Sequence, residues 1–180
     1  YGFQWRHYNA PYENYDTDYT GKGCDQFKNL VEKLKTNPTD RRMIVSAWNP
    51  LQMDQMGLPP CHYSFQVTVI GDKLNLMWNQ RSVDVMLGLP FNIASYGLLL
   101  HLLAKESNLK EGRLVGFLGD THIYENHIEG AKLQLSRNPN ENKLCSIKTE
   151  PFTSIFEWEA EHTTKVAYTS HPKIQFAIAV

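Results

Sequence analysis

The sequence lacks an excess of charge of either sign. Its 180 residues include 18 Lys and Arg against 19 Asp and Glu, which leaves a formal net charge of −1. A nearly neutral chain is unsuited to coating nucleic acid polymers without sequence preference, so we expect no such partner. Hydrophobic residues make up 42% and charged residues 21%, a globular composition that excludes wholesale disorder.

Long apolar runs are absent as well. The most apolar stretch, residues 93–104, is interrupted by Ser95, Tyr96 and His101 and is too short to span a bilayer. It predicts a buried helix in a core that a chain of this length can form without metal or disulfide staples. No basic leader with an apolar segment opens the chain, so we expect neither a secretory start nor a membrane partner.

Cysteines are few. Cys24, Cys61 and Cys145 are odd in number, widely spaced and form no C-x-x-C pair, which argues against a disulfide framework or a zinc site. Free thiols are typical of a reducing compartment, so we expect a cytoplasmic protein. His122 and His127 predict no metal site, because their spacing suits no single helix face and no carboxylate completes the set.

Hydrophobic patterns predict one α+β domain over residues 1–180. Tyr63, Phe65 and Val67 alternate with polar residues, and Gly71-Asp72 signals a hairpin turn before a return strand over residues 74–78. Neighbours on a strand point to opposite faces, so His62 is expected on the face away from Phe65. The other expected elements are a helix over 25–35, a strand over 43–48, a buried helix opened by 90–92, a strand over 113–119, an amphipathic helix carrying Tyr124 and Leu135, a solvated connection over 150–161 and a terminal strand over 174–178.

Cys61 is the first candidate for chemistry. It follows Pro59 and Pro60, which fix the backbone and remove two N–H donors. A rigid approach to one cysteine at the start of a strand suits a positioned nucleophile. The alternative is a turn that carries an incidental thiol, and the motif alone favours that alternative. His62 is a doubtful activating base, because its side chain is expected on the other strand face.

Polar residues also gather at Gln80, Arg81, Ser82 and Asp84. A guanidinium beside a hydroxyl suits a phosphate dianion, and the pair Arg41-Arg42 offers two more guanidinium groups. The alternative is a set of surface salt bridges, each of which contributes little. Three arginines with a serine shift the balance towards an anion site.

Two further positions carry groups that suit a nucleoside. Asn92 at a helix start is typical of a cap, but its amide also matches the N3–H donor and O4 acceptor of uracil and not the opposite pattern of cytosine. His122 and Tyr124 share one face if the chain is locally extended, where they suit a sugar hydroxyl. Ordinary loop polarity is the alternative for this pair.

Taken together, these motifs resemble the thymidylate synthase family. The resemblance runs in order along the whole chain, which makes it more specific than any single motif. The residues that carry it are Tyr1-Gly2-x-Gln4-Trp5-Arg6, Asp40-Arg41-Arg42, Ala47-Trp48-Asn49, Leu58-Pro59-Pro60-Cys61-His62, Gln80-Arg81-Ser82-x-Asp84, Leu87 to Tyr96, Gly119 to Tyr124, His171-Pro172-x-Ile174 and Ala179-Val180.

The resemblance implies a thymidylate synthase-like α+β fold, with a mixed β-sheet, a long buried helix and a sheet face used for dimerisation. It implies a methyltransferase of nucleotide biosynthesis. The substrate would be deoxyuridine monophosphate and the cosubstrate methylenetetrahydrofolate, with no metal. Cys61 would add to C6 of the uracil, after which C5 attacks the one-carbon unit of the folate.

The same resemblance implies roles for the other candidates. Arg81 and Ser82 would bind the nucleotide phosphate, and Arg41 and Arg42 would reach the partner subunit's site in a homodimer. Asn92 would read the uracil edge. The remaining implied roles are His122 and Tyr124 for the deoxyribose hydroxyl, Asp84 for the pterin, Gln80 for the hydrogen-bond network, Tyr1 for proton transfer and Val180 for a C-terminal lid.

Departures from the family pattern leave alternatives open. The family has a section before the position of Tyr1 with a phosphate-binding arginine, a glutamate and tryptophans, so we expect this chain to be the C-terminal part of such a domain. The insert over residues 8–23 resembles a longer form that also occurs fused behind dihydrofolate reductase. A deoxyuridylate hydroxymethylase and an inactive or complementing fragment stay as alternatives. Asn92 in place of Asp argues against a deoxycytidylate hydroxymethylase.

Overall fold

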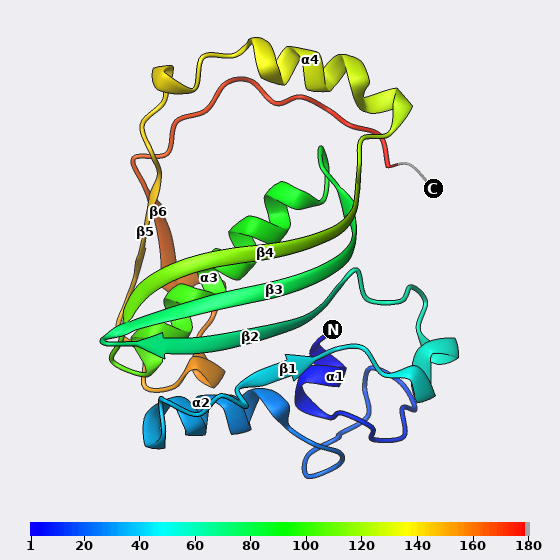
Figure 1. The fold of residues 1–180 in the computed structure, drawn as a ribbon, viewed down its shortest axis with the longest axis vertical. Coiled ribbons are helices and arrows are strands. Elements are labelled where there is room, and N and C mark those ends of the chain that lie inside the picture. The colour runs from blue at the N-terminus through cyan, green and yellow to red at the C-terminus, as the bar shows by residue number, and fades with distance from the viewer. Residues whose placement is uncertain (179–180) are drawn as a thin grey trace. The chain divides into compact units, whose positions relative to one another are not determined.

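The computed structural model describes residues 1–178, and its residues form two compact units (Figure 1). The first unit comprises Tyr1–Val83 and Phe91–Thr121. The second comprises Asp84–Pro90 and the residues from His122 onwards. Within residues 1–178, no helix combines the length and apolar character needed to cross a membrane.

A four-stranded sheet is the centre of the first unit. Its strands are β1 (Ile44–Ser46), β2 (His62–Ile70), β3 (Lys73–Asp84) and β4 (Lys110–His122), and they lie in that order. Strands β1, β2 and β3 are antiparallel, and the expected hairpin turns at Gly71, whose φ of 62° suits glycine. Successive glycines of β4 lie against residues 74, 78 and 81 of β3, so β4 runs parallel to β3 and the predicted mixed sheet is confirmed.

The start of β2 departs from simple alternation. The register between β2 and β3 shifts between His62 and Ser64, which marks a bulge. Because of the extra residue, His62 lies on the same side as Phe65, and both rings contact Tyr96. Tyr63 lies against Trp48 instead. The expectation that His62 points away from Phe65 is therefore wrong.

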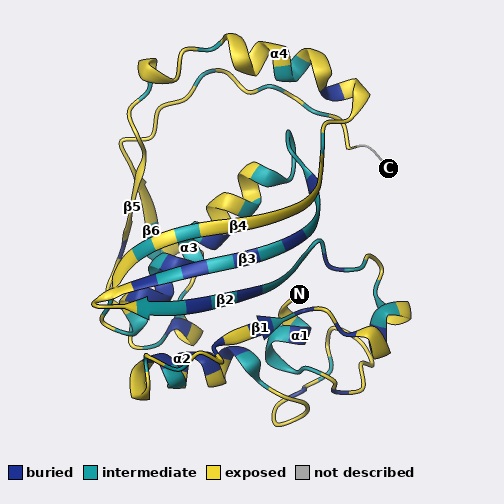
Figure 2. Cartoon of the chain, viewed as in Figure 1, coloured by how far each residue is buried: buried dark blue, intermediate teal, exposed yellow. Residues whose placement is uncertain are grey.

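Three helices cover the inner face of this sheet. They are α1 (Gly2–Arg6), α2 (Gln26–Thr36) and α3 (Leu89–Glu106). The expected α2 is capped by Asp25, whose carboxylate accepts the Lys28 N–H. Trp5 of α1 contacts both Phe27 of α2 and Phe65 of the sheet. Figure 2 shows the resulting core in dark blue, and full burial of a residue such as Phe65 contributes about 1.5–3 kcal/mol.

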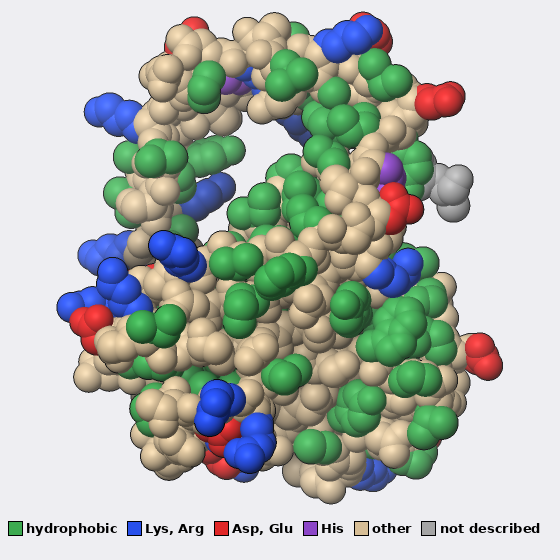
Figure 3. Space-filling view, in the orientation of Figure 1, with side chains coloured by type: hydrophobic (Ala, Val, Ile, Leu, Met, Phe, Trp, Pro, Cys, Tyr) green, Lys and Arg blue, Asp and Glu red, His purple; other side chains and the backbone are tan. Residues whose placement is uncertain are grey.

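The outer face of the sheet carries exposed side chains within the described residues of the first unit. Large apolar side chains are exposed on it, among them Ile44, Ile70, Val115 and Phe117. Green side chains are scattered over this region of the space-filling view (Figure 3). Apolar surface gathered on one sheet face is typical of an interface.

The second unit contains α4 (Ile128–Ser136) and a two-stranded sheet of β5 (Ser146–Thr149) and β6 (Thr163–Val166). Helix α4 begins later than expected, so Tyr124 precedes it as the cap of the short 3-10 turn Glu125–His127. The other 3-10 turns are Pro50–Gln55 in the first unit and Pro139–Glu141, Ile155–Glu157 and Ala160–His162 in the second.

The expected terminal strand does not form. Residues 171–178 have no regular secondary structure, although Ile174 and Phe176 alternate with polar residues. The physical reason lies in their partners, which are side chains of the α4 region instead of another strand. The Pro172 carbonyl accepts from Arg137, and the Ala177 carbonyl contacts His127.

Candidate active site

Cys61 is half-buried at the entrance to β2, where main-chain groups aim the residues around it. The Cys61 N–H donates to the Tyr1 hydroxyl at 2.8 Å. Arg81 donates from Nη2 to the Pro59 carbonyl at 2.8 Å and from Nε to the Pro60 carbonyl at 3.1 Å. The two prolines thus offer fixed acceptors that hold the guanidinium, and its Nη2 lies 3.9 Å from the Cys61 sulfur.

A stack of rings supports this corner. Tyr1 lies flat on His62, with ring centroids 3.9 Å apart and an interplanar angle of 2°. His62 Nδ1 lies 2.9 Å from the hydroxyl of buried Tyr96, which stacks on Trp78. Burial lowers the pKa of His62 and raises the pKa values of Tyr1 and Tyr96. Each shift favours the neutral form, so the three rings form an uncharged platform beside the thiol.

Asn92 is oriented by a chain of hydrogen bonds from the core. The indole N–H of Trp78 can only donate, so the Gln80 oxygen faces it at 3.2 Å. The Gln80 amide nitrogen then donates to the Asn92 oxygen and to the Ser82 carbonyl, each at 3.0 Å. Asn92 therefore keeps its own NH₂ group and one oxygen lone pair for another molecule, which is the donor–acceptor pair that a uracil edge requires.

The remaining arginines are exposed at the start of β1. Arg42 lies 3.9 Å from Asp40, and its N–H donates to that carboxylate at 2.7 Å. This backbone hydrogen bond lowers the pKa of Asp40. Arg41 is exposed, and no ion pair of Arg41 occurs among the described residues. Neither guanidinium contacts Cys61 within residues 1–178.

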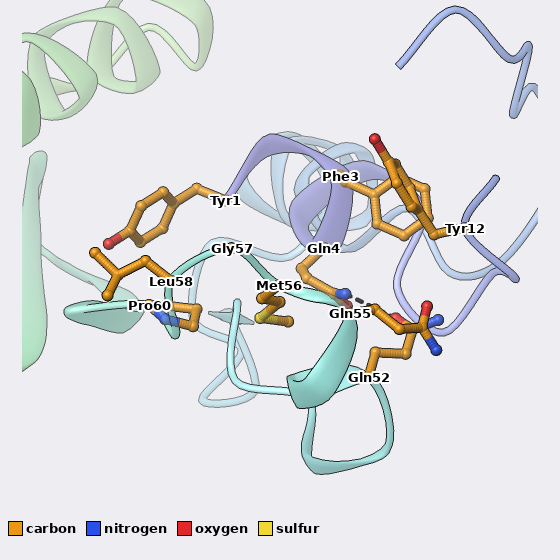
Figure 4. A pocket seen from close by; sticks show the side chains of 10 residues that line it. All are labelled: Tyr1, Phe3, Gln4, Tyr12, Gln52, Gln55, Met56, Gly57, Leu58 and Pro60. Atoms are coloured by element: carbon orange, nitrogen blue, oxygen red, sulfur yellow. Dashed lines mark hydrogen bonds between the residues drawn. The ribbon is translucent and has the colours of Figure 1, made fainter. Parts of the chain in front are cut away.

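A cavity of about 280 Å³ opens beside Tyr1 in the first unit (Figure 4). Tyr1, Leu58 and Pro60 lie on one side of it, close to the position of Cys61, and Gln52 lies on the other. Buried amides stiffen this wall, since Gln4 donates to Gln52 at 2.7 Å and Gln52 donates to the Ala10 carbonyl. The cavity thus borders Tyr1, whose hydroxyl accepts the Cys61 N–H.

The candidates in the second unit form a separate group. Asp84 Oδ1 accepts the N–H groups of Met86 and Leu87 at 3.1 and 3.2 Å, which fixes the orientation of its carboxyl group. His122 and Tyr124 lie ring to ring at 5.0 Å, as expected for a shared face. Val180 lies outside the described residues. Within the described chain, no group of His, Cys, Asp and Glu is arranged to hold a metal ion.

Comparison with known proteins gives one result over the whole chain. The family model "Thymidylate synthase" matches residues 1–180. The chain belongs to the thymidylate synthase family. It is 50% identical over its full length to the bifunctional dihydrofolate reductase-thymidylate synthase of Paramecium tetraurelia, of which it covers 38%. It is 45% identical to the bifunctional enzyme of Leishmania major, of which it covers 35%, and 44% identical to thymidylate synthase of Saccharomyces cerevisiae, of which it covers 62%.

Membership of the thymidylate synthase family confirms the fold class expected from the motifs. The chain spans less than two thirds of the length of each of these relatives. In the first unit, the structure joins Cys61 to Tyr1 and Arg81, and Gln80 to Asn92. It does not bring Arg41 or Arg42 to them within this chain.

The sequence reasoning missed two residues of this family member. Tyr96 contacts His62, and His127 lies beside Asp84. Tyr96 lies within the motif Leu87 to Tyr96, but the apolar helix pattern places it in the core and does not indicate that its hydroxyl contacts His62. The spacing of His127 from His122 bears only on a metal site, and no local sequence pattern indicates that the His127 side chain is buried.

Proposed function

We propose that the protein methylates deoxyuridine monophosphate to thymidine monophosphate, with methylenetetrahydrofolate as the donor of one carbon and one hydride. The observation that carries this proposal is the placement of the Arg81 guanidinium 3.9 Å from the Cys61 sulfur, with the guanidinium held by two proline carbonyls. A cation beside the thiol stabilises the thiolate, which is the nucleophilic form.

The reaction proceeds through a covalent adduct. The Cys61 thiolate adds to C6 of the uracil, and the electron pair of the C5–C6 double bond moves to C5 as an enolate. C5 attacks the methylene carbon of the folate, and one of the two C–N bonds of that carbon breaks. Loss of the C5 proton drives cleavage of the second C–N bond, which frees tetrahydrofolate and leaves a C5=CH₂ group. Tetrahydrofolate transfers a hydride to this CH₂ carbon and becomes dihydrofolate, and the electron pair of the C5=CH₂ bond returns to C5. Expulsion of the thiolate from C6 restores the double bond of the product.

The groups around Cys61 suit the nucleotide. Arg81 uses Nε and Nη2 for hydrogen bonds within the chain, so its Nη1 keeps two N–H donors for a phosphate oxygen. We assign the Ser82 hydroxyl to the same phosphate on the family motif. The Gln80 amide presents Asn92 to the uracil edge. Tyr1 belongs to the proton-transfer region, where its neutral hydroxyl can pass a proton without a net charge.

Further roles rest on the family motif alone. We assign His122 and Tyr124 to the deoxyribose hydroxyl, Asp84 to N–H groups of the pterin and Val180 to a lid. The carboxylate of Asp84 accepts two main-chain donors through one oxygen, which leaves the other oxygen for a ligand.

The assembly is also a proposal. We assign a homodimer built on the outer sheet face, supported by the exposed apolar side chains of Ile44, Ile70 and Phe117. Arg41 and Arg42 would then serve the partner subunit's phosphate site. Two of the relatives are named as bifunctional with dihydrofolate reductase, so a fusion to that enzyme is proposed as well. The three unpaired cysteines support a cytoplasmic location.

The test is turnover of the full-length protein with deoxyuridine monophosphate and methylenetetrahydrofolate, followed as dihydrofolate formation. Cys61→Ser is expected to abolish turnover and to retain nucleotide binding, because a hydroxyl is a far poorer nucleophile than a thiolate at neutral pH. Cys24→Ser is the matched control, because Cys24 is exposed and its sulfur accepts a hydrogen bond from the Asn29 side chain. A hydroxymethylated product without dihydrofolate, or full activity of Cys61→Ser, contradicts the proposal.

A further inference from the structure

The chain's last described residues run along α4 within the second unit. Arg137, just after α4, donates to the Pro172 carbonyl. Near the other end of the helix, Phe176 lies against Gly130 so closely that a Cβ there would meet the ring at 2.3 Å. Figure 1 shows this segment and α4 side by side. We call residues 172–177 the C-terminal strap.

His127 closes the contact between the strap and the start of α4. Its side chain is fully buried, and its Nε2 lies 2.7 Å from the Ala177 carbonyl. A carbonyl can only accept, so the imidazole carries a proton on Nε2 and donates it to the strap. The rings of Phe176 and Tyr124 pack against the imidazole at 5.0 and 5.6 Å and fix its plane.

The other nitrogen of His127 faces Asp84. Nδ1 is buried without a hydrogen-bond partner among the described residues and lies 3.9 Å from Asp84 Oδ1. A buried polar atom without a hydrogen-bond partner lowers the stability of the fold, so a buried Nδ1 of this kind suggests a functional role for His127. The imidazole is a rigid plate whose two nitrogens face the strap and the carboxylate, so it sets the distance between them.

We propose that His127 is a positioning residue that holds the C-terminal strap through its Nε2–H and keeps the strap at a fixed distance from the Asp84 carboxylate. The proposal rests on the proposed function, because that function gives Asp84 the pterin and gives the chain's end the role of a lid. This arrangement makes folate binding and retention of the strap depend on one side chain.

The test compares His127→Phe with the unaltered full-length protein. Phenylalanine keeps a ring against Tyr124 and Phe176 and removes both nitrogens. The KM for methylenetetrahydrofolate is expected to rise about fivefold or more, the effect of one buried hydrogen bond, and by a larger factor than the KM for deoxyuridine monophosphate, because the new ring still packs against Tyr124. Carboxypeptidase is expected to release residues from the ligand-free variant faster. His171→Phe is the control, because its imidazole meets the Asn138 carbonyl at 3.4 Å on the surface.

A second pair of variants guards against misfolding of His127→Phe. His127→Gln retains an N–H donor for the Ala177 carbonyl, and His127→Leu of similar size does not. The Gln variant is expected to keep the strap and the Leu variant to lose it. Equal rises in both KM values, or equal carboxypeptidase release from Gln, Leu and unaltered proteins, overturns the proposal. The carboxypeptidase result needs no turnover, so an inactive but protected wild-type chain refutes the proposed function and not the strap contact.

Discussion

Gly116 of β4 allows the indole of Trp78 to lie directly over the strand. A Cβ at position 116 would come within 2.5 Å of Cζ2 and 2.6 Å of Cη2 of that indole. Carbon atoms in favourable contact lie about 3.5–4.0 Å apart, so either the ring or the strand must move by about 1 Å. The ring has little room to move, because it stacks on Tyr96 and donates to Gln80.

Gly116→Ala is therefore expected to lower the free energy of unfolding by about 1–3 kcal/mol, the usual cost of overpacking a core. For a chain of this length the loss corresponds to a fall in Tm of about 2–12 °C. The displacement of Trp78 also loosens the Gln80–Asn92 chain of hydrogen bonds, so turnover should fall by more than the loss of folded protein explains. Urea denaturation, thermal melting and kcat of the same preparation measure these effects.

Gly2→Ala is the matched control, because a Cβ at Gly2 meets nothing within 4 Å. Alanine in a helix is favoured over glycine by about 0.5–1 kcal/mol, so this variant should be neutral or more stable. A Tm of Gly116→Ala within about 1 °C of that of the unaltered protein, or an equal loss of stability in both variants, would show that Trp78 tolerates a Cβ at position 116.

Two further predictions concern other residues of the site. Asn92→Asp should shift the ratio of kcat/KM towards the cytosine nucleotide, because a carboxylate accepts from the exocyclic amine; an unchanged ratio for the two nucleotides counts against the base-reading role. Burial lowers the pKa of His62 below its ordinary value of 6.5, so the unfolded chain binds more protons and stability should fall as the pH drops below 6.5. Urea midpoints at about pH 7.5 and about pH 5.5 measure this fall, which should be smaller in His62→Gln and is disproved by equal falls in both proteins.

Local sequence patterns predict much of the fold. The helical spacing of Phe27, Leu30 and Leu34 predicts α2 because one helix face is buried, and alternation predicts the β2–β3 hairpin for the same reason. The bulge at the start of β2 could not be predicted from the sequence, because one extra residue does not change the alternation of apolar and polar residues after it. The strand expected over residues 174–178 does not form. Its alternating apolar residues Ile174 and Phe176 pack instead on α4, where Gly130 leaves room for them.

The candidate site, too, can be predicted from the sequence only in part. Cys61, Arg81 and Asn92 follow from motifs, but the reasons for their orientation come from residues distant in sequence. Tyr1 meets Cys61 across an interval that no local pattern describes. His127 is recognisable only from its complete burial, which depends on where the strap lies. Sequence motifs therefore indicate candidate reacting groups more readily than the groups that position them.

The acceptors that hold Arg81 are main-chain carbonyls of Pro59 and Pro60, and this has a consequence for variation at the site. No side-chain replacement at either proline removes an acceptor. Any replacement instead enlarges the conformational freedom of the unfolded loop, an effect worth about 0.4–1 kcal/mol that no contact in the folded state records. Laboratory evolution at these two positions would thus change the stability of the folded protein, without removing the acceptors that hold the guanidinium.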